Sequence, residues 1–192
     1  MQKNKLTWWM TGVAVLLLVL LGILHLTFPR TFVGFTISSN MVYDVLLSLA
    51  GIAVFVRFFT TTHQDNWSYG VFLFALMLHN VGLYENTFFG LGFDRYMHFV
   101  GGLAAALVAD RLFANERWGR VQRFLLIVLV PLGCGAAAEI VEWFGYATFG
   151  AGDGFLLYGA GDIGEWQNAS LDMFSNLVGA LTVAVWRVTR KS

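Results

Sequence analysis

The chain has 192 residues, of which 57% are hydrophobic and 12% are charged, and its mean hydropathy is +0.65. An ordinary soluble domain carries about twice that share of charged residues, so the composition excludes a soluble globular protein. Twelve basic and twelve acidic residues balance, which gives no indication of a nucleic-acid partner. The single cysteine, Cys134, excludes an intrachain disulfide.

The apolar residues fall into six blocks, each about as long as the roughly 20-residue helix that crosses a bilayer. In chain order the predicted spans are residues 8–28, 41–59, 69–88, 95–113, 122–148 and 170–187. The first block follows Lys3 and Lys5, as a signal peptide would, but its apolar run is too long for one, so we interpret it as a retained helix. The sequence therefore predicts an all-α, polytopic membrane helix bundle that forms a single domain.

The basic residues predict how these helices are oriented. With a cytoplasmic N-terminus, ten of the twelve Lys and Arg residues fall on the cytoplasmic side, and only Arg30 and Arg95 fall outside. This asymmetry is what the positive-inside rule requires, so we expect both termini in the cytoplasm. Residues 149–169 contain six glycines, three acidic residues and no Lys or Arg, which indicates a cap over the outer side of the bundle.

In this orientation most acidic residues lie at one depth. Nine of the twelve fall in outer loops or in the outer halves of spans: Asp44, Glu85, Asp94, Glu139, Glu142, Asp153, Asp162, Glu165 and Asp172. Several are spaced to share one helix face, such as Asp94 with His98 and Asp172 with Asn176. Because ionisable groups within a bilayer normally face the bundle interior, we expect a polar, acidic cavity that opens outward.

Carboxylates and neutral imidazole are the ligands of Mg, Mn, Fe and Zn, so this cavity is a candidate site for a divalent cation. The predicted metal ligands are Asp94, His98, Glu139 and Glu142. Glu139 and Glu142 are also the candidate catalytic acid and base, and alternatively they share one proton. The residues expected to orient these groups or to bind substrate are His79, Tyr84, Glu85, Arg95, Asp162, Asp172 and Asn176.

Several of these residues also have a purely structural interpretation. Asp94 and Arg95 are adjacent and can form an interfacial ion pair. Asp44 and Asp172 stand near predicted helix starts, where an acidic residue serves as an N-cap, and for Asp44 we prefer this interpretation. Single histidines in apolar helices, such as His25 and His79, usually pair with a backbone carbonyl or a neighbouring hydroxyl.

Four motifs resemble a known family. They are His79-Asn-Val-Gly-Leu-Tyr84, Asp94-Arg-Tyr-Met-His98-Phe, Glu139-Ile-Val-Glu142-Trp, and Gly161-Asp162 followed by Asp172-Met. Their order resembles the YjdF-like family of small bacterial inner-membrane proteins of unknown function. Asp94-Arg95, His98-Phe99, Glu139 and Asp172 four residues before Asn176 are more distantly similar to VanZ-like membrane proteins, which are associated with glycopeptide-antibiotic tolerance. The resemblance implies a multi-pass protein of the bacterial cytoplasmic (inner) membrane that acts in the cell envelope.

Together these observations give one main hypothesis and two alternatives. The main hypothesis is an integral inner-membrane protein whose outward-facing acidic and histidine site binds a divalent cation and handles an amphipathic or lipid-linked envelope substrate, by hydrolysis or group transfer. The alternatives are a proton- or cation-coupled transporter and a structural or assembly protein with a buried polar network. The sequence has no P-loop, HExxH motif or nucleophile elbow, so it does not decide whether the protein is an enzyme.

Overall fold

The computed structural model describes residues 2–27, 31–32, 35–36, 41–61, 66–113, 118–149 and 165–189. This part of the chain contains six helices: α1 (Gln2–Thr27), α2 (Met41–Thr61), α3 (Asn66–His79), α4 (Phe93–Leu112), α5 (Arg120–Phe149) and α6 (Glu165–Thr189). Two short antiparallel hairpins pair β1 (Thr31–Phe32) with β2 (Phe35–Thr36) and β3 (Thr87–Phe88) with β4 (Leu91–Gly92). The structure therefore confirms the predicted all-α helix bundle.

Among the described residues, three helices are long and apolar enough to cross a membrane by themselves. They are Lys5–Thr27 in α1, Arg120–Gly145 in α5 and Gln167–Thr189 in α6. Helix α3 has only 14 residues. Helix α4 has 20 residues, but acidic and basic side chains stand in both its first and its last turn.

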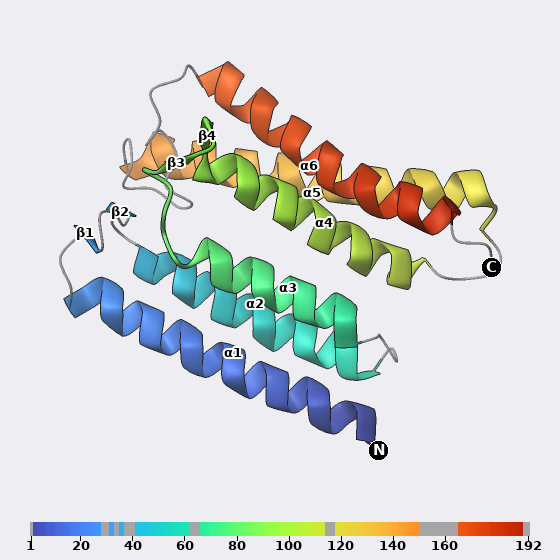
Figure 1. Cartoon of the computed structure of the whole chain (residues 1–192), viewed down its shortest axis with the longest axis horizontal. Helices are drawn as coiled ribbons and strands as arrows, with labels where there is room; N and C mark the ends of the chain where they lie inside the picture. Colours follow the sequence, from blue (N-terminus) through green and yellow to red (C-terminus); the bar gives the residue numbers. More distant parts are fainter. Residues whose placement is uncertain are drawn as a thin grey trace.

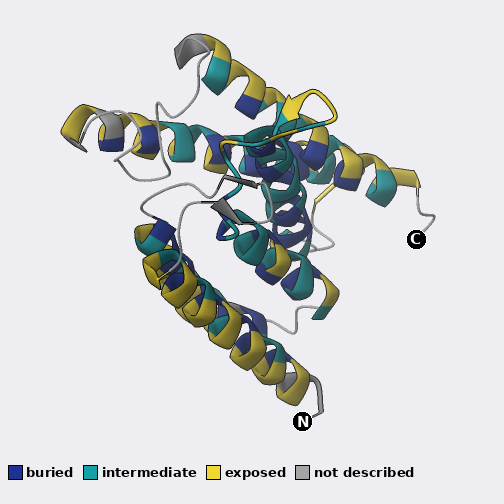
Figure 2. Ribbon diagram, turned by 60° about the vertical axis from the view of Figure 1, so that its left-hand side comes forward, coloured by how far each residue is buried: buried dark blue, intermediate teal, exposed yellow. Residues whose placement is uncertain are grey.

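The six helices form two groups of three, α1–α3 and α4–α6 (Figure 1), and the buried residues lie on the helix faces that turn inward (Figure 2). Leu18 of α1, Ile52 of α2 and Leu73 of α3 belong to the hydrophobic core of the first group, and Leu107 of α4, Ile127 of α5 and Ala184 of α6 belong to that of the second. Helices α3 and α4 pack against each other and join the two groups. Any site between α3 and the α4–α6 group is therefore bounded by both halves of the molecule.

The start of α1 and the end of α6 lie at the same end of the bundle (Figure 1). Both β-hairpins lie at the opposite end, which we call the hairpin end. This arrangement is what an even number of passes requires. That α1 begins in the cytoplasm stays a prediction.

The third predicted span is wrong over its second half. Helix α3 ends at His79, and residues 80–88 form a turn and strand β3 instead of continuing the helix to residue 88. Gly82 has a positive φ of 74°, which favours glycine and is typical of a residue just beyond a helix end. Asn80 donates both its backbone N–H, at 3.2 Å, and its side-chain amide, at 2.7 Å, to the Leu76 carbonyl oxygen in the last turn of α3.

The bounds of the predicted cap also differ from the structure. Residues 165–169 are the first residues of α6, and Phe149 is the last residue of α5. The rest of the predicted cap, including Asp162, lies outside the described residues.

At the end opposite the hairpins, Asp110 joins the three C-terminal helices. Its side chain is fully buried in α4. Arg123 of α5 donates to its Oδ1 atom from Nη2 at 2.6 Å and from Nε at 3.0 Å. The Nε atom of Arg187 on α6 lies 2.6 Å from Oδ2. One buried carboxylate therefore holds a guanidinium from each of the two neighbouring helices.

Helices α4 and α6 approach each other at two glycines. A Cβ atom added at Gly102 would overlap the backbone of Asn176, and one added at Gly179 would overlap the Phe99 carbonyl oxygen and lie 2.8 Å from the Leu103 nitrogen. Small residues at a helix crossing permit this close approach in membrane proteins. The contact brings His98, one turn before Gly102, up to the polar face of α6.

Gly179→Ala should therefore destabilise the protein by about 1–3 kcal/mol, because the added methyl group forces α4 and α6 apart. The measurement is the free energy of unfolding of the purified protein in detergent. Gly133→Ala is the matched control. It also replaces a glycine within a helix, but a Cβ at Gly133 meets nothing within 4 Å. Equal stabilities for the two variants would contradict the close packing of α4 on α6.

Candidate functional site

The first turns of α4 carry Asp94, Arg95 and His98 to the hairpin end of the bundle. Asp94 and His98 are four residues apart and therefore lie on one face of the helix, where His98 Nε2 is 3.4 Å from Asp94 Oδ1. Arg95 points toward α6, where it donates to Asp172 Oδ1 and, at 2.6 Å, to Asn168 Oδ1. It also contacts Asp94 Oδ2 at 3.2 Å, so the predicted Asp94–Arg95 ion pair forms within a larger network.

His98 lies at the centre of the acidic residues. Its Nε2 atom is 3.5 Å from Asp172 Oδ1 on α6 and 3.9 Å from Glu139 Oε1 on α5. Its Nδ1 atom is 3.1 Å from the Asn176 side-chain amide. One imidazole nitrogen is thus held by an amide, and the other faces carboxylates from three helices.

Two sets of ligand-type atoms converge around this imidazole. Asp94, His98 and Asp172 form one set, and His98, Glu139 and Glu142 form the other; within each set the atoms lie within 4.8 Å of one another. The structure thus brings together the four residues predicted as metal ligands and adds Asp172 to them. We call these five residues the acidic cluster.

The acidic cluster contains more carboxyl groups than the cationic side chains that contact it. Among the described residues, Arg95 is the cation that contacts it, against four carboxylates. Asp172 is fully buried and Glu142 is 9% exposed. Asp172 Oδ2 and both carboxylate oxygens of Glu139 are buried, and in the described structure they have no hydrogen-bond partner. Buried carboxylates without a partner are costly, so this site favours an added cation or proton.

The opposite wall of the site comes from the N-terminal half of the protein. The hydroxyl group of Tyr84 forms a hydrogen bond with His79 Nδ1, and His79 Nε2 lies 4.0 Å from Asp44 Oδ1. Burial, followed by the charge of the Asp94 carboxylate, raises the pKa of the Tyr84 phenol well above its usual value. Tyr84 therefore keeps its proton and serves as a neutral hydrogen-bonding group.

The prediction that Asp44 is a helix N-cap is wrong. Helix α2 begins at Met41, so Asp44 is its fourth residue, and the side chain is only 2% exposed. It faces His79 because the packing of α2 against α3 turns this side of α2 inward. Its position at the common depth of the acidic residues was the available signal, but the sequence could not show which helix lay opposite. Asp172 is not an N-cap either, since α6 begins at Glu165.

The other histidine of this region matches its structural interpretation. His25 Nε2 lies 2.8 Å from the backbone oxygen of Asn80, and the Asn80 amide donates to Ser48 Oγ at 2.7 Å. These bonds connect α1, α2 and the end of α3. His25 therefore supports the wall of the site without lining its cavity.

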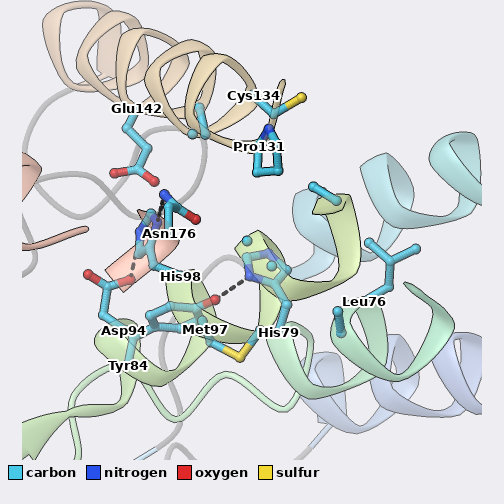
Figure 3. A pocket seen from close by; sticks show the side chains of 16 residues that line it. Leu76, His79, Tyr84, Asp94, Met97, His98, Pro131, Cys134, Glu142 and Asn176 are labelled. Atoms are coloured by element: carbon cyan, nitrogen blue, oxygen red, sulfur yellow. Dashed lines mark hydrogen bonds and ion pairs between the residues drawn. The ribbon is translucent and has the colours of Figure 1, made fainter. Parts of the chain in front are cut away.

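A cavity of about 260 Å³ lies between the two walls (Figure 3). Its polar lining comprises His79, Tyr84, Asp94, His98, Glu142 and Asn176. Figure 3 shows Asp94, His98, Glu142 and Asn176 gathered on one side, with Tyr84 next to Asp94 and its hydroxyl group directed to His79 on the other side. Glu85, predicted to orient groups or bind substrate, is exposed and does not line this cavity.

Comparison with known proteins gives one match. The family model described as "Predicted membrane protein (DUF2238)" matches residues 6–192. The chain belongs to the DUF2238 family. Neither a curated protein nor a solved structure matches this DUF2238 chain. The match supports the coarser expectation of a membrane protein of unknown function, and it does not bear on the resemblance to YjdF-like or VanZ-like proteins.

Proposed function

We propose that this DUF2238 protein binds a divalent cation in the acidic cluster at the hairpin end of its bundle. The observation that supports this proposal is that two buried carboxylates beside His98 Nε2 keep oxygens without partners: both oxygens of Glu139, of which Oε1 lies 3.9 Å from Nε2, and Oδ2 of Asp172, whose Oδ1 lies 3.5 Å from Nε2. A divalent cation would supply the positive charge that Arg95 alone does not provide. Oxygen and imidazole ligands suit Mg, Mn, Fe or Zn.

The hydrogen bond of Asn176 determines how His98 can take part. As placed, the Asn176 amide nitrogen faces His98 Nδ1, so the imidazole proton is on Nε2, toward the carboxylates. For Nε2 to bind a cation, the Asn176 amide must turn so that its oxygen accepts a hydrogen bond from the Nδ1–H group. The two amide orientations occupy the same space, and a second group that holds the other ring nitrogen is typical of metal-binding histidines.

The substrate that fits this cavity is amphipathic, because one side of the lining is acidic and the remainder is apolar. A divalent cation lowers the pKa of a bound water and so supplies a nucleophile for hydrolysis or transfer. Glu142 is a member of the acidic cluster that also lines the cavity, and where its carboxylate is free of the cation it is placed to accept a proton. Tyr84 and His79, on the opposite wall, are placed to hold the polar end of the substrate.

The two alternative functions predict different behaviour. A transporter needs a polar path across the bundle, but residues 99–109 of α4, between His98 and Asp110, contain no ionisable side chain. A purely structural network needs hydrogen bonds and no cation. Variants that change hydrogen bonding and charge separately therefore distinguish the cation site from a structural network.

Asn176→Ala should lower the affinity for Mn²⁺ by about 10–100-fold, because it removes the group that orients His98. Asn176→Asp should retain the affinity, since a carboxylate accepts from Nδ1 and leaves Nε2 for the cation. The measurement is a titration of the purified protein with Mn²⁺. Ser175→Ala is the control on the same helix, because its hydroxyl bonds only to the Leu171 carbonyl in the described structure. Unchanged affinity in Asn176→Ala would contradict the role of Asn176 in orienting His98 toward the cation.

A further inference from the structure

The cavity continues from the acidic cluster into an apolar half that the cation site does not use. This half is lined by Ala75 and Leu76 of α3 and by Pro131 and Cys134 of α5, and Met97 of α4 lies where it meets the polar side. In Figure 3, Pro131, Cys134 and Leu76 lie on the side away from Asp94 and Glu142. A ligand that fills the whole cavity therefore has a polar end and an apolar end.

The apolar half reaches the middle of a membrane-spanning helix. Cys134 lies near the centre of the span Arg120–Gly145 and is exposed as well as being part of the cavity lining. The cavity therefore meets the outer surface of the bundle at mid-membrane depth, where that surface contacts hydrocarbon. Water at this depth would lack hydrogen-bond partners along an apolar wall, whereas a hydrocarbon chain needs none.

Small side chains keep this space open. Gly101, Ala105 and Ala138 line the cavity, and a Cβ atom added at Gly101 would meet nothing within 4 Å. Gly102, its neighbour, differs because its Cβ position is occupied by the backbone of α6. Close packing of α4 on α6 thus accounts for Gly102, whereas Gly101 borders unfilled volume.

We propose that one hydrocarbon chain of a bilayer lipid enters this apolar half sideways, between α3 and α5, and so brings the lipid head group to the acidic cluster. The inference rests on the proposed function, and it names a membrane lipid as the substrate class of that site. The exposed apolar surface of α5 is continuous with the mouth of the cavity, since Ala137 and Val141, three and seven residues after Cys134 on the same face of the helix, are exposed, Val141 by 44%. The hydrocarbon chain of the lipid can therefore pass from the bilayer into the cavity without crossing a polar region.

Photo-crosslinking tests this directly. The full-length protein is reconstituted in phosphatidylglycerol vesicles that contain phosphatidylglycerol with a diazirine in the middle of one acyl chain, and adducts are mapped by mass spectrometry. We expect an adduct on Met97, which is only 8% exposed and lines the cavity, in addition to adducts on Ile140 and Phe144 of the outer surface. Adducts on the surface residues without one on Met97 would overturn the proposal.

Two leucine variants give a matched comparison. Gly101→Leu fills the cavity and should reduce the Met97 adduct to background, while Gly133→Leu adds the same side chain at an exposed position of α5 and should leave it unchanged. Surface adducts should be equal in both variants, which shows that each is inserted. A Met97 adduct that persists in Gly101→Leu would place the lipid chain outside the cavity and contradict the proposal.

Elemental analysis of the same samples separates this inference from the cation site. A Met97 adduct in wild type with no bound divalent metal would support lipid entry and contradict the proposed cation. Bound metal without a Met97 adduct would support the cation site and contradict lipid entry. Gly101→Leu should retain its metal, because Gly101 contributes no ligand.

Discussion

Protein purified without a chelator should contain about one divalent cation per chain, and His98→Ala, Glu139→Gln and Glu142→Gln should each reduce that content strongly. Each substitution removes a ligand atom without removing apolar surface, so the variants should still insert and purify. Loss of a residue that only holds a metal ligand by a hydrogen bond typically lowers metal affinity 10–100-fold, and loss of the ligand itself should lower it at least as much. The measurement is elemental analysis by mass spectrometry.

Glu85→Gln is the matched control for the glutamate variants, since Glu85 is exposed and lies outside the cavity lining. A structural network would respond differently, because Gln preserves many hydrogen bonds and the two Gln variants would then be nearly silent. Wild-type protein with no metal, whose melting temperature does not rise with added Mg, Mn, Fe or Zn, would contradict the cation site. A shared proton between Glu139 and Glu142 would then be the better interpretation.

Asp110→Asn should destabilise the protein by about 3–5 kcal/mol, because it leaves the guanidinium groups of Arg123 and Arg187 without the buried carboxylate that they contact. The effect should appear as a lower free energy of unfolding in detergent. Metal content per folded chain should stay unchanged, since Asp110 lies at the end of α4 remote from the acidic cluster.

The double variant Asp110→Asn/Arg187→Gln should recover part of this loss, because removal of both partners leaves fewer uncompensated charges than removal of one. Glu85→Gln again serves as the exposed control, with an expected change within about 0.5 kcal/mol. A stability of Asp110→Asn equal to that of wild type would show that the ion pairs of Asp110 do not hold α4, α5 and α6 together.

The number and type of the helices followed from the sequence, because hydrocarbon imposes a length and an apolar composition on each span. The predicted blocks around α1, α2, α4, α5 and α6 each correspond to a helix. Hydropathy averages over many residues, however, and it does not respond to a turn such as the one that follows His79 and contains Gly82 with its positive φ. That is why the prediction extended the third helix to residue 88, past its end at His79.

The sequence also indicated which polar residues would meet. Helical spacing placed Asp94 with His98 and Asp172 with Asn176, and the cost of charge in a bilayer directed these faces inward. Both arguments depend only on local geometry and on the solvent. The roles of these residues in binding stay predictions until metal and ligand are measured.

Tertiary structure alone decided what lies between the two halves of the bundle. It placed Asp44 opposite His79, made Gly102 and Gly179 the contact between α4 and α6, and left open the apolar half of the cavity beside Gly101. Each of these features depends on the separation and rotation of helices distant in the chain. Periodicity shows which face of a helix is buried, but it does not show which side chain fills the space in front of that face, because that is set by the packing of the neighbouring helices.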